Sequence, residues 1–181
     1  MSSRGKTGTL TRRQLLSGSA LGGVSLTIGC RLGRSSAWEF LSDEQARTLA
    51  ALCDQVVPAD DFPSASQAGV LDYIDRQLAR VYRRHRAAYS DGLVRLDTLS
   101  RTRFGRGIAA LSVDLQFQAV TAFAEQDKSF FELVRNHTLE GYYGSPRHGG
   151  NRDAVSWRML GLAEPPIRGR APYDLTKGST S

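Results

Sequence analysis

The sequence lacks the short motifs that commonly mark catalytic or redox centres. Its 181 residues contain no CxxC, CxxCH, GxSxG or HExxH pattern, and no nucleophile, base and oxyanion donor stand in a recognisable order. The spacing around Gly149 and Gly150 is neither that of a dinucleotide-binding fingerprint nor that of a phosphate-binding loop. The sequence therefore predicts no catalytic residue, no cofactor site and no metal site in this chain.

Acidic residues are absent from residues 1–37, and this absence explains the net charge of the chain. The formal charge is +6, and residues 1–37 hold six Lys or Arg side chains, which leaves 18 basic against 18 acidic residues in the remainder. A neutral remainder does not have the charge excess of a nucleic-acid-binding protein. The basic run at residues 83–86 is interpreted as a solvated helix end or as a rim for an acidic partner.

Long hydrophobic runs are also missing. Residues 15–29 form a weakly apolar run that is too short for a comfortable bilayer span and is typical of a signal peptide. The run follows Arg12 and Arg13, which form a twin-arginine export signal, so residues 1–37 are predicted to be a leader. Small residues near Ala37 favour cleavage after that position. Lipidation of Cys30 and retention of the leader as an anchor are the alternatives.

The twin-arginine route exports proteins that have already folded, commonly because they received a cofactor in the cytoplasm. This chain shows no cofactor site of its own, so we expect the leader to serve a second, leaderless chain that is exported while bound to this one. The alternative is that the domain folds too fast for the route that exports unfolded chains.

Alternating strand patterns and internal repeats are absent, and apolar residues recur instead at helical steps of three and four. The sequence predicts an all-α domain at residues 38–162, a compact irregular bundle of about six helices. We expect these helices near residues 42–57, 67–84, 86–104, 112–126, 129–142 and 152–160. Ser42 and Gln45 are placed to form a capping box at the first helix. Residues 163–181 are predicted to be an extended Pro- and Gly-rich tail that wraps a partner or is disordered.

Cysteine is scarce, with only Cys30 and Cys53 in the chain. Removal of the leader would leave Cys53 without a partner in the chain. Cys53 occupies an apolar position of the first predicted helix, and a free cysteine behaves as a small hydrophobic residue, so we expect it to be buried.

Two histidines and a glutamate are candidate metal ligands. His137 and Glu140 are three residues apart on a predicted helix, which matches half of a carboxylate di-metal motif, but the other half is missing. We therefore favour a core or interface role for His137. The alternative is a stand-alone periplasmic enzyme or metal-binding protein that uses His137, Glu140 and His148. Asp60 and Asp61 are interpreted as turn residues.

Residues 137–161 combine a helix, an aromatic hinge, a Gly-rich loop and a short helix that Asn151 would cap and Gly161 would end. Several side chains of this stretch bury a large area and also carry a polar group, which is favourable at protein–protein contacts. We predict a partner-facing surface, or its direct support, at Tyr142, Tyr143, Arg147, Asn151 and Trp157. The alternative is that these aromatic residues close the core of a small helical domain.

Two patches of the sequence resemble a known family. Residues 139–144, together with residues 149–151, Trp157 and Gly161, resemble the C-terminal signature of the gluconate 2-dehydrogenase subunit 3 family. Residues 56–75 resemble the N-terminal signature of the same family. The likeness covers about residues 41–162.

This resemblance implies a small, non-catalytic γ subunit of a membrane-bound, FAD-dependent sugar or sugar-acid dehydrogenase. FAD would lie in a large partner chain of the glucose–methanol–choline type, and haem c would lie in a c-type cytochrome subunit. The small subunit would stabilise the large chain and carry it through the twin-arginine translocase. The resemblance thus implies a complex on the periplasmic face of the inner membrane.

Overall fold

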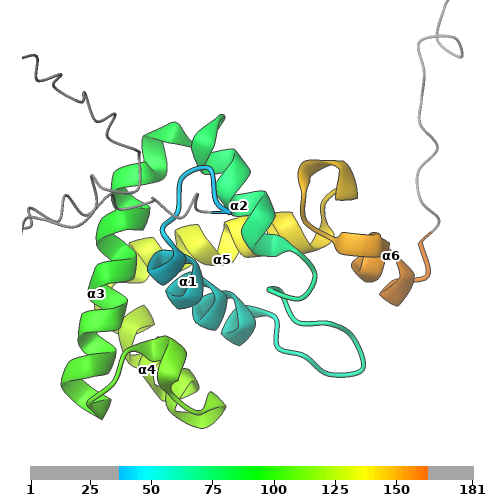
Figure 1. Cartoon of the computed structure of the whole chain (residues 1–181). Coiled ribbons are helices and arrows are strands. Elements are labelled where there is room, and N and C mark those ends of the chain that lie inside the picture. The colour runs from blue at the N-terminus through cyan, green and yellow to red at the C-terminus, as the bar shows by residue number, and fades with distance from the viewer. Residues whose placement is uncertain (1–36, 163–181) are drawn as a thin grey trace, which may run out of the picture. The chain divides into compact units, whose positions relative to one another are not determined.

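The computed structural model describes residues 37–162, which lie in the unit that spans Arg34–Ser181. The predictions for Arg12, Arg13, Cys30 and the tail concern residues outside this range. The described part of the chain contains six α-helices and no strand, which confirms the all-α prediction (Figure 1). The helices are α1 (Asp43–Val56), α2 (Val70–Ala79), α3 (Arg86–Phe104), α4 (Val113–Gln126), α5 (Lys128–Tyr143) and α6 (Val155–Met159).

Helix α1 lies at the centre of the fold and packs against α2, α3, α4 and α5. Its first turn is closed by the predicted capping box, in which Ser42 and Gln45 each accept a hydrogen bond from the backbone N–H of the other. Its inner side carries Leu49, Leu52 and Cys53, none of which is accessible to solvent. Because these side chains face four helices, α1 organises the core.

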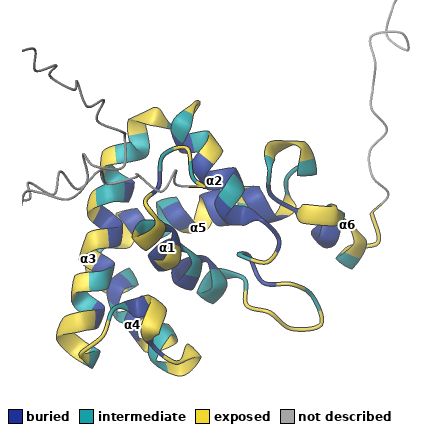
Figure 2. Ribbon diagram, in the orientation of Figure 1, coloured by how far each residue is buried: buried dark blue, intermediate teal, exposed yellow. Residues whose placement is uncertain are grey.

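The core is continuous from α1 to α5, and Figure 2 shows that each of these helices has both buried and exposed residues along its length. Thr138 on α5 donates a hydrogen bond to the sulfur of Cys53 at 3.2 Å. Burial raises the pKa of the Cys53 thiol to about 12. The thiol is therefore protonated and inert at neutral pH, as its predicted burial implied.

Helix α2 is shorter than predicted at both ends. Gly69 adopts a left-handed conformation with φ +81° just before the helix, so residues 67–69 form a turn and not a first helical turn. At the other end, Arg80 leaves the helical conformation. The side chains of Arg83 and Arg86 fold back and donate hydrogen bonds to the carbonyl groups of Leu78 and Ala79. The basic run therefore caps a helix end, where cations are favourable.

The remaining helix boundaries follow the sequence closely, except at the C-terminus. Helix α3 has its predicted bounds. Ser112 precedes α4 as expected, but its side chain makes no capping hydrogen bond. Helix α5 begins at Lys128 and is capped by Asp127. The last predicted helix is divided into a 3₁₀ turn, Arg152–Ala154, and the short α6.

No helix within residues 37–162 has the length and hydropathy required to cross a bilayer.

Candidate partner-binding site

The two segments that resemble family signatures meet in space. The Tyr142 hydroxyl donates a hydrogen bond to the carbonyl oxygen of Pro63 at 2.9 Å. The backbone N–H of Arg152 donates to the carbonyl oxygen of Ala68 at 2.8 Å, and its guanidinium pairs with Asp72 at 3.0 Å. We call this contact between residues 63–76 and residues 141–157 the C-terminal junction.

The C-terminal junction depends on close approach between backbones. A Cβ atom built on Gly150 would lie 2.2 Å from the carbonyl oxygen of Gly141. A Cβ atom built on Gly141 would lie 2.9 Å from the ring of Tyr73 on α2. Real Cβ atoms do not tolerate such distances, so glycine at position 150 allows the loop to lie directly on α5, and glycine at position 141 allows α5 to approach the Tyr73 ring of α2.

Asn151 fixes the path of the loop from within the C-terminal junction. It is fully buried and has a left-handed conformation, with φ 47° and ψ 47°. Its Nδ2 donates to the carbonyl oxygen of Gly144 at 2.8 Å, and its Oδ1 accepts from the backbone N–H of Ser156 at 2.9 Å. The side chain thus joins the end of α5 to the first turn of α6, where it caps the N–H of Ser156, but it makes no capping bond to the 3₁₀ turn that directly follows it.

Backbone strain is concentrated just after Asn151. Asp153 and Ala154 also have positive φ, at 56° and 52°, and with Asn151 they are the only non-glycine residues of the described chain that do. A side chain in this conformation costs about 1–2 kcal/mol per residue. Such strain persists only where the surroundings determine the conformation, and it is common where a surface has a function.

Apolar side chains are exposed to solvent at the end of α5 and on α6 and the residues that follow it. Trp157 is half-buried, and its Nε1 donates to the carbonyl oxygen of Tyr143 at 2.9 Å, which joins α6 to the end of α5. The side chains of Tyr143, Leu160 and Leu162 are 42%, 55% and 56% exposed. We call Tyr143, Trp157, Leu160 and Leu162 the exposed apolar face.

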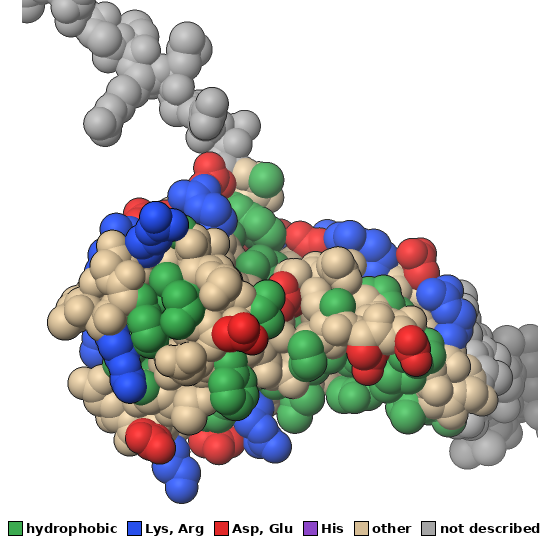
Figure 3. Space-filling model, turned by 90° about the horizontal axis from the view of Figure 1, so that it is seen from below, with side chains coloured by type: hydrophobic (Ala, Val, Ile, Leu, Met, Phe, Trp, Pro, Cys, Tyr) green, Lys and Arg blue, Asp and Glu red, His purple; other side chains and the backbone are tan. Residues whose placement is uncertain are grey.

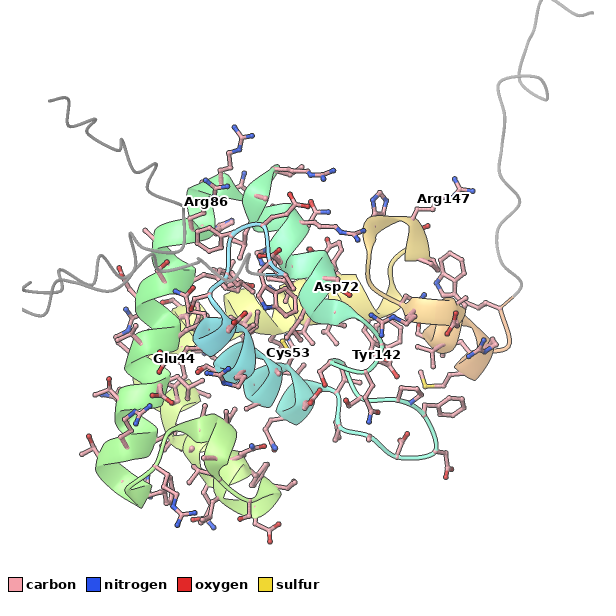
Figure 4. All side chains as sticks on the ribbon, in the orientation of Figure 1. Glu44, Cys53, Asp72, Arg86, Tyr142 and Arg147 are labelled. Carbon is pink, nitrogen blue, oxygen red and sulfur yellow. The ribbon has the colours of Figure 1, made fainter. Side chains whose placement is uncertain are left out.

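The structure places the five predicted interface residues in two groups. Tyr143 and Arg147 are exposed, and Trp157 is half-buried (Figure 4 labels Arg147 and Tyr142). Tyr142 and Asn151 are buried, so they can contribute only as the direct support that was also predicted. The two tyrosines fall on either side of this division, since Tyr142 is buried and Tyr143 is exposed. Their rings meet edge to face, with centroids 5.2 Å apart.

Figure 3 shows exposed hydrophobic side chains on the underside of the molecule in several separate groups, with charged side chains between and around them. Phe117 on α4 is 62% exposed and lines a groove of about 500 Å³ with Val120 and Phe131. This groove belongs to the helical bundle and not to the C-terminal junction.

His137 is a core histidine, as favoured from the sequence. Its Nδ1 lies 2.9 Å from the Tyr89 hydroxyl, and its ring stacks on Tyr82 with centroids 4.3 Å apart. Burial lowers the pKa of His137, although the nearby Glu140 opposes this shift. Glu140 itself accepts hydrogen bonds from the hydroxyls of Tyr73 and Tyr82. Residues 37–162 hold no cluster of three His, Cys, Asp or Glu side chains suited to a metal ion.

Two aspartates with structural roles were missed by the sequence analysis. Asp54 on α1 accepts hydrogen bonds from the backbone N–H and the hydroxyl of Ser66, and so fastens the loop before α2. Asp75 on α2 is 3% exposed and accepts backbone N–H groups near the start of the described chain. The available signal for Asp75 was an acidic residue on the apolar side of an amphipathic helix, next to Leu71, Ile74 and Leu78.

Comparison with protein families matches residues 43–163 to the model of gluconate 2-dehydrogenase subunit 3. The chain belongs to this family. The resemblance noted in the sequence is thereby confirmed, and the C-terminal junction lies inside the matched region. Comparisons with curated proteins and with solved structures find no match. The family is named for a subunit of gluconate 2-dehydrogenase.

Proposed function

We propose that this member of the subunit 3 family is the non-catalytic small subunit of an FAD-dependent sugar or gluconate dehydrogenase on the periplasmic face of the inner membrane. It stabilises a large flavin chain of the glucose–methanol–choline type and carries that chain through twin-arginine export. FAD belongs to the large chain, and haem c belongs to a cytochrome subunit. The contribution of this chain is a binding surface.

The observation that carries this proposal is the exposed apolar face on a rigid support. Tyr143 and Trp157 are residue types that dominate binding energy at interfaces, and Arg147 adds a third at the neighbouring turn. The C-terminal junction holds the backbone of this region through Asn151 before any partner binds. A preorganised surface loses little conformational entropy on binding, so more of the contact energy appears as affinity.

The leader supports the export role. Arg12 and Arg13 would be read by the translocase, which accepts folded cargo. A large chain bound to the exposed apolar face would cross the membrane together with this chain. Replacement of Arg12 and Arg13 by Lys should therefore retain the flavin chain in the cytoplasm, together with this chain. Deletion of this chain should lower the periplasmic level and activity of the flavin chain. Unchanged periplasmic activity after the deletion would refute the proposal.

The binding surface itself is tested by a pair of exposed aromatic residues. Tyr143→Ala removes a side chain of the exposed apolar face, and Phe117→Ala removes a similarly exposed ring on α4. Both changes should alter the melting temperature little, because surface substitutions usually cost less than about 0.5 kcal/mol. Tyr143→Ala should weaken binding to the large chain about tenfold, as expected for an interface hot spot.

Co-purification and titration with the large chain provide the measurement. Trp157→Ala should likewise reduce co-purification more than it reduces the melting temperature. An equal or greater loss of binding with Phe117→Ala would assign the interface to the bundle and not to the exposed apolar face.

A further inference from the structure

The carboxylate of Asp75 holds the first residues of the described chain. Its Oδ2 accepts the backbone N–H of Glu39 at 2.6 Å, and its Oδ1 accepts those of Phe40 and Leu41, both at 2.9 Å. Asp75 is 3% exposed. Three N–H donors on one buried carboxylate compensate the loss of its hydration, and hydrogen bonds to an ionised acceptor are stronger than neutral ones.

Side chains of the same segment also bind to the fold. Trp38 and Phe40 pack against the core, and the guanidinium of Arg86 lies 5.1 Å from the centroid of the Phe40 ring. Glu39 pairs with Arg80 at 3.3 Å on the surface. We call residues 38–41 with Asp75 the N-terminal clasp. The clasp begins at the residue that follows Ala37.

The position of the clasp bears on how the leader can be removed. A protease binds its substrate as an extended segment on both sides of the bond that it cleaves. Folded chains are therefore cut at exposed loop tips or after local unfolding. On the C-terminal side of the bond between Ala37 and Trp38, the backbone N–H groups of residues 39–41 all donate hydrogen bonds to Asp75. Cleavage at this bond thus requires the clasp to open. Cys30 precedes the clasp by eight residues in the sequence.

We infer that the N-terminal clasp blocks cleavage after Ala37 once the domain has folded, so that the exported chain keeps residues upstream of Trp38. This inference rests on the proposed twin-arginine route, because that route presents a folded chain to the leader peptidase. The retained residues include either the apolar run at 15–29 or an acylated Cys30. Both are hydrophobic groups, so the small subunit is itself an attachment point of the complex to the membrane.

Cleavage of the purified full-length chain by a purified type I leader peptidase tests the inference without any export step. A synthetic peptide of residues 30–45 contains the same bond but no Asp75. The peptide should be cut after Ala37, and the full-length chain should be cut there at least about tenfold more slowly, since charge-assisted hydrogen bonds must first be broken.

Variants show whether the clasp is responsible. Asp75→Asn should speed cleavage of the full-length chain toward the rate of the peptide. Asp72→Asn is the matched control, because Asp72 lies on the same helix and pairs with Arg152 at the surface; its rate should stay low. Phe40→Ala loosens the clasp without changing the carboxylate, and circular dichroism verifies that each variant remains folded. If Asp75→Asn unfolds, Phe40→Ala decides the result.

Several outcomes would overturn the inference. These are a wild-type chain cut as fast as the peptide, a peptide that is not cut after Ala37, or folded Asp75→Asn and Phe40→Ala chains that both stay resistant. The inference would also be overturned if the intact mass of the exported small subunit showed that its first residue is Trp38. Failure of the export proposal would be seen separately, as a small subunit that remains in the cytoplasm while the cleavage rates are as expected.

Discussion

The helical body and the C-terminal junction are held together in different ways. In the body, α1 contributes the fully buried side chains of Leu49 and Leu52 to a continuous apolar core. In the C-terminal junction, the decisive contacts are those of backbone with backbone, such as Gly150 on Gly141, and those of the amide of Asn151 with two backbone groups.

This difference has a physical consequence. Apolar burial supplies most of the stability of a domain, but it is not directional and tolerates repacking. Contacts that involve hydrogen-bonded backbone and glycine allow only one arrangement. The body is therefore expected to determine whether the chain is folded, and the C-terminal junction to determine where the exposed apolar face lies.

The largest expected effect belongs to the body. Leu49→Ala should lower the free energy of unfolding by about 2–5 kcal/mol, because it deletes a fully buried side chain and leaves a cavity. Urea unfolding gives this value. Binding to the large chain, corrected for the folded fraction, should change little. Leu160→Ala, at an exposed position, is the control with the opposite expectation: little change in stability and weaker binding. If Leu49→Ala weakens binding as strongly as Leu160→Ala, the two regions are not separable.

A smaller effect is expected when a methyl group is placed within the C-terminal junction. Gly150→Ala brings a Cβ atom against the carbonyl oxygen of Gly141, so the loop must shift at a cost of about 1–3 kcal/mol. Gly105→Ala is the matched control, because Gly105 has φ +75° but no atom within 4 Å of a built Cβ. The control should cost about 1–2 kcal/mol from its conformation alone and leave binding intact. Equal effects of the two substitutions on stability and binding would show that the close approach is unimportant.

Relief of backbone strain at Ala154 should increase the stability of the protein, whereas the two preceding kinds of substitution should decrease it. Ala154→Gly should raise the free energy of unfolding by up to about 1 kcal/mol, because glycine adopts φ 52° without a steric penalty. Ala87→Gly, at an exposed position in the first turn of α3, should instead lower stability by less than about 1 kcal/mol. Thermal unfolding of the two variants compares them directly, and a destabilised Ala154→Gly protein would contradict the assignment of strain to this segment.

The smallest effect is a pH dependence within the body. Burial lowers the pKa of His137, so below the ordinary value of 6.5 the unfolded chain binds a proton that the folded chain does not. The stability from neutral His137 is thus present above pH 6.5 and is lost as the pH falls below it. His137→Gln should flatten the decline in stability between pH 7 and pH 5, as followed by urea unfolding. His148→Gln, at an exposed position, should leave the decline as it is in the wild type.

Several features of this protein are encoded within a few neighbouring residues and were predicted correctly for that reason. The capping box needs only Ser42 and Gln45, and the bounds of α3 follow from its apolar spacing and from Gly105. Gly161 ends α6 with φ +67°, as expected, and the N–H groups of residues 161 and 162 bond back to the carbonyls of Arg158 and Trp157. The burial of Cys53 followed from its position in the apolar stripe of α1.

Other features required the folded chain. The C-terminal end of α2 is capped by arginine side chains that return from the next turn, and the side chain of the left-handed Asn151 finds its partners at Gly144 and Ser156. The side chains of Tyr142 and Tyr143 are adjacent and alike in sequence, yet one is buried and the other exposed.

Local propensity and periodicity specify helices because their hydrogen bonds and apolar faces repeat within four residues. They do not specify which helix meets which loop. The carboxylate of Asp75 reaches backbone groups 34–36 residues away, and Tyr142 reaches Pro63 across 79 residues. Such pairs exist only after the apolar faces of α1, α2 and α5 have packed. Packing thus gave these ordinary residues their roles as a clasp and as a support for the exposed apolar face.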